Sequence, residues 1–341
     1  MKYPLVSFCI ATYKHPEILR STVNAILNQE YPNLEIIVSD NDPEGSAGKI
    51  INAFNSKKII YNKNKSNLGM VKNFNKAFSL SSGSFVIILA DDDPPTKNML
   101  SIFKTLYIKY PNAKAFLGAC YVDITSEKIG EITHLKKGAN SFINPSKKYG
   151  QVDILGPKEF YRQFLSMRLF PHYLWSAGLF SRDIVSQIKG VPDYGSPHFS
   201  DYAFLLKIAA KNNFVAINRE LATNSIHEYS YGKELASIKD YEKGVLGFNK
   251  EISKTAYQLG YKEEFEKFIS KMVIMFLVDR FTFYKRHGYK IDPKFLYNTY
   301  KDLGKKLTFL KKNDNELYLR LYFYFPFNKA YNLLNYIKDR K

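Results

Sequence analysis

The chain of 341 residues is 45% hydrophobic and 24% charged, which is the composition of a folded globular protein and excludes a disordered or fibrous one. Its 50 Lys and Arg residues against 32 Asp and Glu residues give a net charge of +18, which calls for an anionic partner: a nucleic acid, a phospholipid surface or a phosphorylated substrate. Cys9 and Cys120 lie far apart in apolar segments, which excludes a disulfide framework and a metal-ligand pattern, so we expect reduced thiols in a cytoplasmic protein.

The first third of the chain alternates strand-like and helix-like segments. Residues 5–11 and 85–90 are nearly continuous apolar runs, as in strands that are buried on both faces of a parallel sheet. The other elements expected here are strands at 34–39 and 58–61 and helices at 16–28 and 70–78. This β-α-β order predicts an α/β fold with a doubly wound, mostly parallel sheet, in which ligands bind beyond the carboxyl ends of the strands.

The rest of the chain is expected to be mixed at first and then helical. The predicted elements are strands at 115–121 and 175–180, a helix at 201–211, and helices beyond residue 241. We expect a domain over residues 1–235, with halves of about 1–110 and 111–235, and a mostly helical region over 236–341. The apolar run Met272–Val278 is far shorter than the ~20 residues of a membrane-spanning helix, so we expect no span.

Three consecutive aspartates, Asp91 to Asp93, follow directly after the strand expected at residues 85–90. Like charges placed together raise one another's pKa values unless a cation neutralises them, so the triplet points to a metal site. Carboxylate oxygens suit Mg²⁺ or Mn²⁺, ions that bridge a protein carboxylate to a diphosphate. The alternative is an exposed acidic turn that caps a helix beginning near Pro95, since Asp is favoured at helix starts.

The stretch from Leu5 to Leu100 resembles the family 2 glycosyltransferases, the large inverting group with the GT-A fold. The segments that carry the resemblance are, in chain order, Val6–Tyr13, Ile26–Glu35, Asp40, Asn67–Gly69 with Asn73, Ser82–Phe85 and Asp91–Asp93. One such motif is weak, but six in the right order are specific. The resemblance implies a GT-A, Rossmann-like doubly wound sheet followed by a helical C-terminal region.

The resemblance also implies a nucleotide-sugar donor, a UDP-sugar first among the candidates, and Mn²⁺ or Mg²⁺ as cofactor. Asp91 and Asp93 correspond to the two ends of the family's DxD motif, with Asp93 as the direct metal ligand, and Asp92 is a candidate contact to ribose or metal. The donor-binding residues that it implies are Ala11, Thr12, Tyr13, Asp40, Asn67, Gly69, Asn73, Asp91 and Asp92.

Transfer with inversion needs a base that takes the proton of the attacking hydroxyl. In the family this base is an Asp or Glu at the start of a helix, and Asp201 matches that position, although it could instead be a carboxylate favoured by the helix dipole. His227 resembles a family histidine that reaches the metal or diphosphate, whereas a lone His is more often structural. His172 and Trp175 fall where the family builds its acceptor wall, and Trp175 could equally be a core residue.

The C-terminal region is strongly basic, with 18 Lys or Arg against 9 Asp or Glu over residues 261–341. Lys305–Lys306, Lys311–Lys312 and Lys338–Lys341 flank the aromatic stretch Tyr318–Phe327, a combination that fits docking on an anionic membrane surface, at the inner face of the cytoplasmic membrane. The alternative is a helical subdomain whose aromatic side chains are core and whose lysines are solvated.

The resemblance, together with these features, implies a metal-dependent inverting hexosyltransferase. It would move a sugar from a nucleoside diphosphate to a hydroxyl of a saccharide, expected to be a lipid-linked oligosaccharide of bacterial surface polysaccharide synthesis. The alternative is a basic nucleic-acid- or membrane-binding protein without transferase activity. We expect no nucleic-acid partner, because no nucleic-acid-binding motif is present. Neither G-x-x-x-x-G-K-[ST] nor G-x-G-x-x-G occurs, which argues against a kinase or a dehydrogenase.

Overall fold

A computed structural model describes residues 3–127, 129–130, 135–167, 173–227, 237–286, 288 and 290–322. Packing divides the chain into two compact units, Met1–Gly260 and Tyr261–Lys341. Helix α9 (Ser237–Gln258) therefore belongs to the first unit, and the boundary expected near residue 235 stays a prediction.

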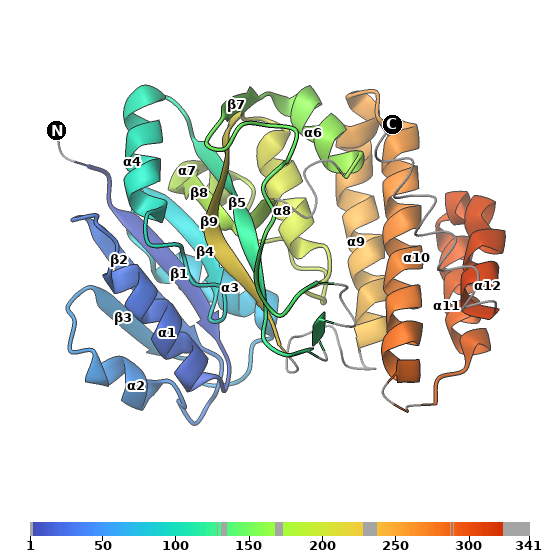
Figure 1. Cartoon of the computed structure of the whole chain (residues 1–341), viewed down its shortest axis with the longest axis horizontal. Coiled ribbons are helices and arrows are strands. Elements are labelled where there is room, and N and C mark those ends of the chain that lie inside the picture. The colour runs from blue at the N-terminus through green and yellow to red at the C-terminus, as the bar shows by residue number, and fades with distance from the viewer. Residues whose placement is uncertain are drawn as a thin grey trace. The chain divides into compact units, whose positions relative to one another are not determined.

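The first unit is built on a nine-stranded mixed sheet with the strand order β3-β2-β1-β4-β8-β5-β9-β7, to which β6 adds by pairing with β5 (Figure 1). Its parallel first half consists of β1 (Val6–Thr12), β2 (Leu34–Asp40), β3 (Ile59–Lys63) and β4 (Phe85–Ala90). Its second half consists of β5 (Ala115–Ile124), β6 (Gly138–Ser141), β7 (Val152–Leu155), β8 (Tyr173–Ser181) and β9 (Phe214–Ile226). The carboxyl ends of β1, β2 and β4 therefore meet at one edge of the sheet.

Helices bury both faces of the parallel half, which explains its continuous apolar strands. One face packs against α1 (Pro16–Leu27), α2 (Gly48–Ala53) and α4 (Met99–Lys109), while α3 (Met70–Leu80) covers β1 and β2 from the other face (Figure 1). Other helices in the described part of this unit include α6 (Pro157–Leu165), α7 (Arg182–Gln187) and α8 (Ser200–Ala209).

The expected strands and helices of the first third are confirmed, and the helix expected at 201–211 is α8. The second half of the sheet is more mixed than expected, because β8 pairs antiparallel with both β4 and β5, whereas β5 and β9 are parallel. No helix begins near Pro95: that residue forms a bridge with Ala222, and α4 begins at Met99. The aspartate triplet is therefore not the cap of such a helix.

A hydrogen-bonded turn at the amino edge of the sheet contains residues of two of the sequence motifs. The Glu35 carboxylate accepts hydrogen bonds from the Ser7 hydroxyl at 2.6 Å, the Ser82 N–H at 2.6 Å and the Gly83 N–H at 3.1 Å. The Glu35 side chain on β2 thereby fixes the turn that precedes β4. These hydrogen bonds hold the pKa of Glu35 below its ordinary value against the opposing effect of burial.

Gly83→Ala should destabilise the first unit, because a Cβ there would lie 2.4 Å from Ser7 Oγ and 2.7 Å from the Leu5 carbonyl oxygen. We expect a loss of about 1–3 kcal/mol, the usual effect of overpacking, in denaturant unfolding. Gly156→Ala is the matched control, since its Cβ would make only an ordinary 3.5 Å contact with Asn213. Equal stabilities of the two variants would contradict the close packing of Gly83 against Ser7 and Leu5.

The second unit contains α10 (Lys262–Arg286), α11 (Pro293–Lys306), the 3₁₀ helix η1 (Thr308–Asn313) and α12 (Asp314–Tyr322). Asp292 caps α11 by accepting the Lys294 N–H at 2.9 Å, and the buried Tyr300 hydroxyl donates to the Leu310 carbonyl at 2.7 Å. None of the helices in the described ranges is both long and apolar enough to cross a membrane.

Candidate active site

An asparagine network holds the carboxyl ends of β1 and β2 together. The buried Asn73 amide on α3 donates to the carbonyls of Thr12 at 3.2 Å and Ser39 at 3.0 Å. Asn64 donates to the Asn73 side-chain oxygen at 2.9 Å and to that of Asn41 at 3.3 Å. The predicted donor residue Asn73 thus acts in this structure as a positioning residue for the edge, and its contact with a donor stays a prediction.

Asn67 and Gly69 extend this network to the surface. The Asn67 side-chain oxygen accepts the Gly69 N–H at 2.9 Å and the Asn41 amide at 2.6 Å. Gly69 has φ +82°, which a residue with a side chain adopts only under strain, and space around it is open. Both residues are exposed beside the strand ends, where a donor could reach them.

Asp40 is fully buried and has both carboxylate oxygens engaged. One oxygen accepts the Asp42 N–H at 2.9 Å, and the other accepts the Ala47 N–H at 3.1 Å and the Tyr61 hydroxyl at 2.8 Å. The carboxylate therefore braces the turn after β2. The predicted contact of Asp40 with the donor's base remains a prediction.

The aspartate triplet lies at the end of β4, directly beside the end of β1. The Thr12 hydroxyl donates to Asp91 Oδ2 at 2.5 Å, and the Thr22 hydroxyl of α1 donates to the Asp91 carbonyl at 2.6 Å. Asp91 and Asp93 are each only 7% exposed. Ala11 is buried in β1, whereas Tyr13 is exposed just beyond it. The edge of the sheet thus places two buried carboxyl groups next to an accessible turn.

Two carboxyl groups of the triplet have raised pKa values. Burial, followed by the charge of Asp92, raises the pKa of Asp91 to about 7 against the hydrogen bond from Thr12. Burial and Asp92 also raise the pKa of Asp93 well above its ordinary value, and the Ser176 hydroxyl on β8 opposes the shift. Ionised carboxylates at these positions need a cation.

Two histidines complete the cluster. His227, at the end of β9, lies with its Nε2 3.0 Å from Asp92 Oδ2. His15, the residue before α1, has its Nδ1 3.9 Å from Asp91 Oδ2, and the two imidazole rings are 6.0 Å apart. The structure thus brings the predicted His227 to the triplet. It also adds His15, which sequence reasoning left unassigned because a lone histidine has no local signature.

The residues present fit a divalent cation. Within the described ranges, no three His, Cys, Asp or Glu side chains converge into a complete metal site. Mg²⁺ at a phosphate-binding site does not need three protein ligands, since it takes one or two carboxylates and completes its coordination shell with substrate phosphates and water. Asp93 and Asp91, with His227 as a further candidate, would hold the ion, which when bound neutralises charge on a departing diphosphate.

Asp91→Asn should change how stability depends on pH. The folded-state pKa of Asp91 is about 7, whereas its ordinary value is 3.8. The unfolded chain therefore releases this proton at a lower pH than the folded protein does, and the free energy of unfolding of wild type falls as the pH rises from 3.8 through about 7. In EDTA, the melting temperature of the variant relative to wild type should therefore rise between pH 5 and pH 8. We expect at least about 2–4 °C, the effect of ~1 kcal/mol at this size, and a pH-independent difference would contradict the assignment.

Asp201 lies in the first turn of α8 and is partly accessible. Its carboxylate accepts the Tyr202 N–H at 2.9 Å. Burial raises the pKa of Asp201 to about 6, and backbone hydrogen bonds oppose the shift. A carboxyl group with a pKa close to neutrality is suited to accept a proton at physiological pH.

Trp175 lies on β8 between two helices that carry predicted site residues. Its ring is 4.9 Å from that of Phe74 on α3 and 5.9 Å from that of Phe204 on α8, both edge-on. Trp175 is thus partly a packing residue, as its alternative interpretation proposed, and its role in an acceptor wall stays a prediction. His172 lies outside the described residues.

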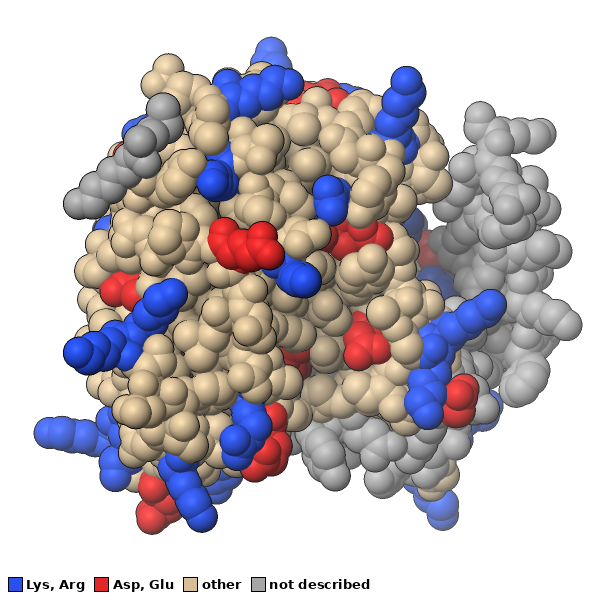
Figure 2. Space-filling view, turned by 60° about the vertical axis from the view of Figure 1, so that its left-hand side comes forward, with Lys and Arg blue, Asp and Glu red and all other residues tan. Residues whose placement is uncertain are grey.

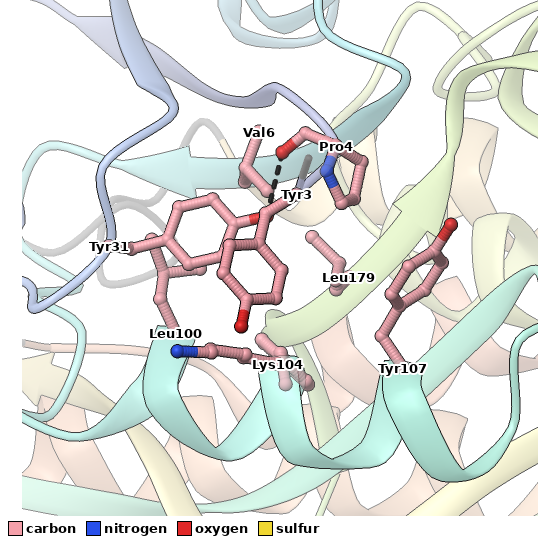
Figure 3. Close-up of a pocket in the computed structure, with 9 residues that line it drawn as sticks. Tyr3, Pro4, Val6, Tyr31, Leu100, Lys104, Tyr107 and Leu179 are labelled. Atoms are coloured by element: carbon pink, nitrogen blue, oxygen red, sulfur yellow. Dashed lines mark hydrogen bonds between the residues drawn. The ribbon is translucent and has the colours of Figure 1, made fainter. Parts of the chain in front are cut away.

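A small apolar pocket lies at the opposite edge of the sheet from the triplet. Figure 3 shows Tyr31 and Tyr3 beside Lys104 of α4, close to the amino end of β1. The Tyr31 hydroxyl donates to the Pro4 carbonyl at 2.6 Å, and the Lys104 ammonium lies 4.4 Å from the Tyr3 ring centre. This pocket holds none of the predicted site residues, so it is not the site described above.

A mixed sheet with a parallel first half, an acidic strand end and an amide-braced turn at the same edge define the class of GT-A folds. Solved structures agree: the chain is similar to the S. aureus protein TarS 1–349 in complex with UDP-GlcNAc, with a TM-score of 0.64, 15% identity, and coverage of 92% of this chain and 86% of that chain. It is also similar to the mannosyltransferase PcManGT from Pyrobaculum calidifontis in complex with GDP-Man and Mn²⁺, with a TM-score of 0.52 and 14% identity over 94% of this chain and 88% of that chain.

The sequence profile described as Glycosyl transferase family 2 matches residues 7–188, and the chain belongs to that family. Among its relatives is the abequosyltransferase RfbV of Salmonella typhimurium, 39% identical over 106 residues, which are 30% of this chain and 32% of that protein. Another is the Escherichia coli UDP-Glc:alpha-D-GlcNAc-diphosphoundecaprenol beta-1,3-glucosyltransferase WfaP, 34% identical over 89 residues, 26% of this chain and 36% of that protein. The matches thus span about a third of these two relatives.

Proposed function

We propose that this protein is an inverting glycosyltransferase that moves a sugar from a nucleoside diphosphate to a hydroxyl of a saccharide in bacterial surface polysaccharide synthesis. The observation that carries the proposal is the cluster of Asp91, Asp92 and Asp93 at the end of β4, with two of the carboxyl groups buried and their pKa values raised. The names of RfbV and WfaP support the class of reaction, and that of WfaP supports a diphosphoundecaprenol-linked acceptor.

In the proposed mechanism the protein orients two reactants and moves one proton. The turn after Thr12 receives the nucleoside, with Asp40 bracing the neighbouring strand end. Asp201 accepts the proton of the acceptor hydroxyl as that oxygen attacks the anomeric carbon, and the bond from this carbon to the diphosphate oxygen breaks. The products are the glycosylated acceptor, the nucleoside diphosphate and a protonated Asp201.

A thermal-shift screen of UDP-, GDP-, CDP- and dTDP-sugars with and without Mn²⁺ tests this proposal, since a ligand that binds only the folded state raises the melting temperature. We expect one nucleotide class to stabilise the protein in a Mn²⁺-dependent way, and a UDP-sugar is our first candidate because the related fold of TarS binds UDP-GlcNAc. Folded protein that responds to none of the four classes would contradict the proposal.

We also propose that the second unit docks on an anionic membrane surface at the inner face of the cytoplasmic membrane. Tyr318 and Tyr322 of α12 are 42% and 41% exposed and stack with ring centres 4.5 Å apart. Tyr297 lies 5.5 Å from Tyr318, and the Lys301 ammonium lies 4.9 Å from the Tyr297 ring centre. Exposed aromatic rings beside lysines suit the membrane interface. Lys338–Lys341, which belonged to the original prediction, lie outside the described residues.

Sedimentation with phosphatidylcholine vesicles, with and without phosphatidylglycerol, tests this docking. We expect binding that requires the anionic lipid, weakens in salt and falls in Tyr318→Ser and Lys301→Glu. Ile108→Ser, which removes an apolar side chain that is 50% exposed on α4, should bind as wild type does. Unchanged binding in both second-unit variants would refute this surface.

On the described part of the face in Figure 2, Lys and Arg are interleaved with Asp and Glu and form no continuous basic stripe for nucleic acid.

A further inference from the structure

Helix α9 packs unusually closely on the segment that leads into α8. A Cβ at Gly244 would lie 2.5 Å from the His198 carbonyl oxygen and 2.9 Å from the His198 Cβ. A Cβ at Gly247 would lie 2.4 Å from the Tyr194 ring. Because no real Cβ tolerates such distances, glycine at both positions is what lets α9 approach residues 194–198.

Polar contacts fix the same two elements. Glu251 of α9 accepts the Tyr194 hydroxyl at 2.5 Å on one carboxylate oxygen and the Lys207 ammonium of α8 at 2.5 Å on the other. The Lys207 ammonium also donates to the Ile188 carbonyl at 3.0 Å. One carboxylate thus joins α9 to the loop before α8 and to α8 itself.

This packing lies directly next to a strained residue. Phe199, immediately before α8, has φ +69°, a left-handed conformation that is costly for a residue with a bulky side chain. It is buried, with its ring 5.4 Å from that of Tyr241 and 5.1 Å from that of Phe248, both on α9. Surrounding structure must impose such a conformation, and α9 supplies the aromatic surface that does so.

We propose that α9 is a clamp that positions Asp201, with Gly244, Gly247, Glu251 and Phe199 as positioning residues. The inference rests on the proposed role of Asp201 as the base. Phe199 sets the direction in which α8 begins, and Asp201 lies two residues further on, so any shift of the segment moves the carboxylate. A displacement of about 1 Å at a reacting group can cost on the order of 100-fold in rate.

The test compares Gly247→Ala with Gly83→Ala in the full chain. Gly83→Ala is the stability control, because its clash lies at the amino edge of the sheet. Turnover is measured as release of nucleoside diphosphate from the panel sugar that stabilises the wild type, and the affinity for that sugar by calorimetry. We expect Gly247→Ala to lose about 10- to 100-fold in kcat with donor affinity within about twofold of wild type, and Gly83→Ala to keep kcat.

If Gly247→Ala does not fold, Tyr194→Phe serves as a second variant, because it preserves the packing. It keeps the ring and removes the hydroxyl that Glu251 accepts, so kcat should fall while donor affinity holds. The proposed role of α9 is overturned if Asp201→Asn is inactive but Gly247→Ala and Tyr194→Phe lose no more kcat than Gly83→Ala. It is also overturned if these two variants lose donor affinity in parallel with kcat. Full activity of Asp201→Asn would instead refute the proposed base itself.

Discussion

Asp93→Ala should abolish Mn²⁺-dependent binding of the sugar nucleotide and reduce turnover by at least about 10²- to 10³-fold, the usual loss when a charge-stabilising group leaves a reaction centre. Asp93 is 7% exposed, and burial together with the Asp92 charge raises its pKa well above the ordinary value. Its ionised form therefore depends on a cation more than that of a solvated carboxylate does. Calorimetric titration with and without Mn²⁺ measures the effect apart from activity.

Two outcomes decide the role of Asp93. Glu17→Ala is the control, because it removes a carboxylate of α1 whose side chain is 76% exposed, and its metal response should equal that of wild type. If Asp93→Ala binds the sugar nucleotide with the same gain from Mn²⁺ as wild type, Asp93 does not hold the cation. The ion would then belong to other carboxylates of the triplet, which Asp91→Ala and Asp92→Ala would identify.

Asp201→Asn should keep donor affinity and lose about 10²- to 10⁴-fold in kcat, the usual contribution of a general base. Burial raises the pKa of Asp201 to about 6, so the wild-type rate should rise as the pH increases through about 6 and the base ionises. The residual activity of the variant should lack this acidic limb. A pH profile of kcat at saturating donor measures both effects.

The control for Asp201→Asn is another carboxylate in the first turn of a helix. Asp183 lies in the first turn of α7 and pairs with the Lys114 ammonium at 2.6 Å, so Asp183→Asn removes a helix-dipole and ion-pair interaction without touching the site. It should lose stability but retain kcat and the acidic limb. An Asp201→Asn enzyme that behaves like Asp183→Asn would mean that Asp201 serves only the start of its helix.

The parallel half of the fold could be predicted because its physics is local. Strands buried on both faces, such as β1 and β4, need continuous apolar runs, and helices that cover them repeat apolar residues at helical spacing. The second half could be predicted only in part: the strands expected at 115–121 and 175–180 are β5 and β8, but β9 was not expected. β9 contains Asn218, Arg219 and Glu220 within its 13 residues, and only its pairing with β5 and β7 makes it a strand.

The site, like the fold, could be predicted from the sequence only in part. Three consecutive aspartates after an apolar strand predicted the triplet, whereas the turn after Thr12 and His227 were implied by the resemblance to the glycosyltransferase family. The sequence could not show that Asp40 is fully enclosed by Asp42, Ala47 and Tyr61, or that His15 lies beside Asp91. Burial and side-chain direction depend on contacts between segments that are distant in the chain.

The most direct test of the central claim is release of nucleoside diphosphate from the sugar nucleotide that stabilises the protein, measured with Mn²⁺ for wild type and Asp93→Ala side by side. We predict release by wild type that EDTA abolishes and that Asp93→Ala lacks. Equal release by folded Asp93→Ala, or release that EDTA leaves unchanged, would contradict a metal-assisted transferase centred on the aspartate triplet.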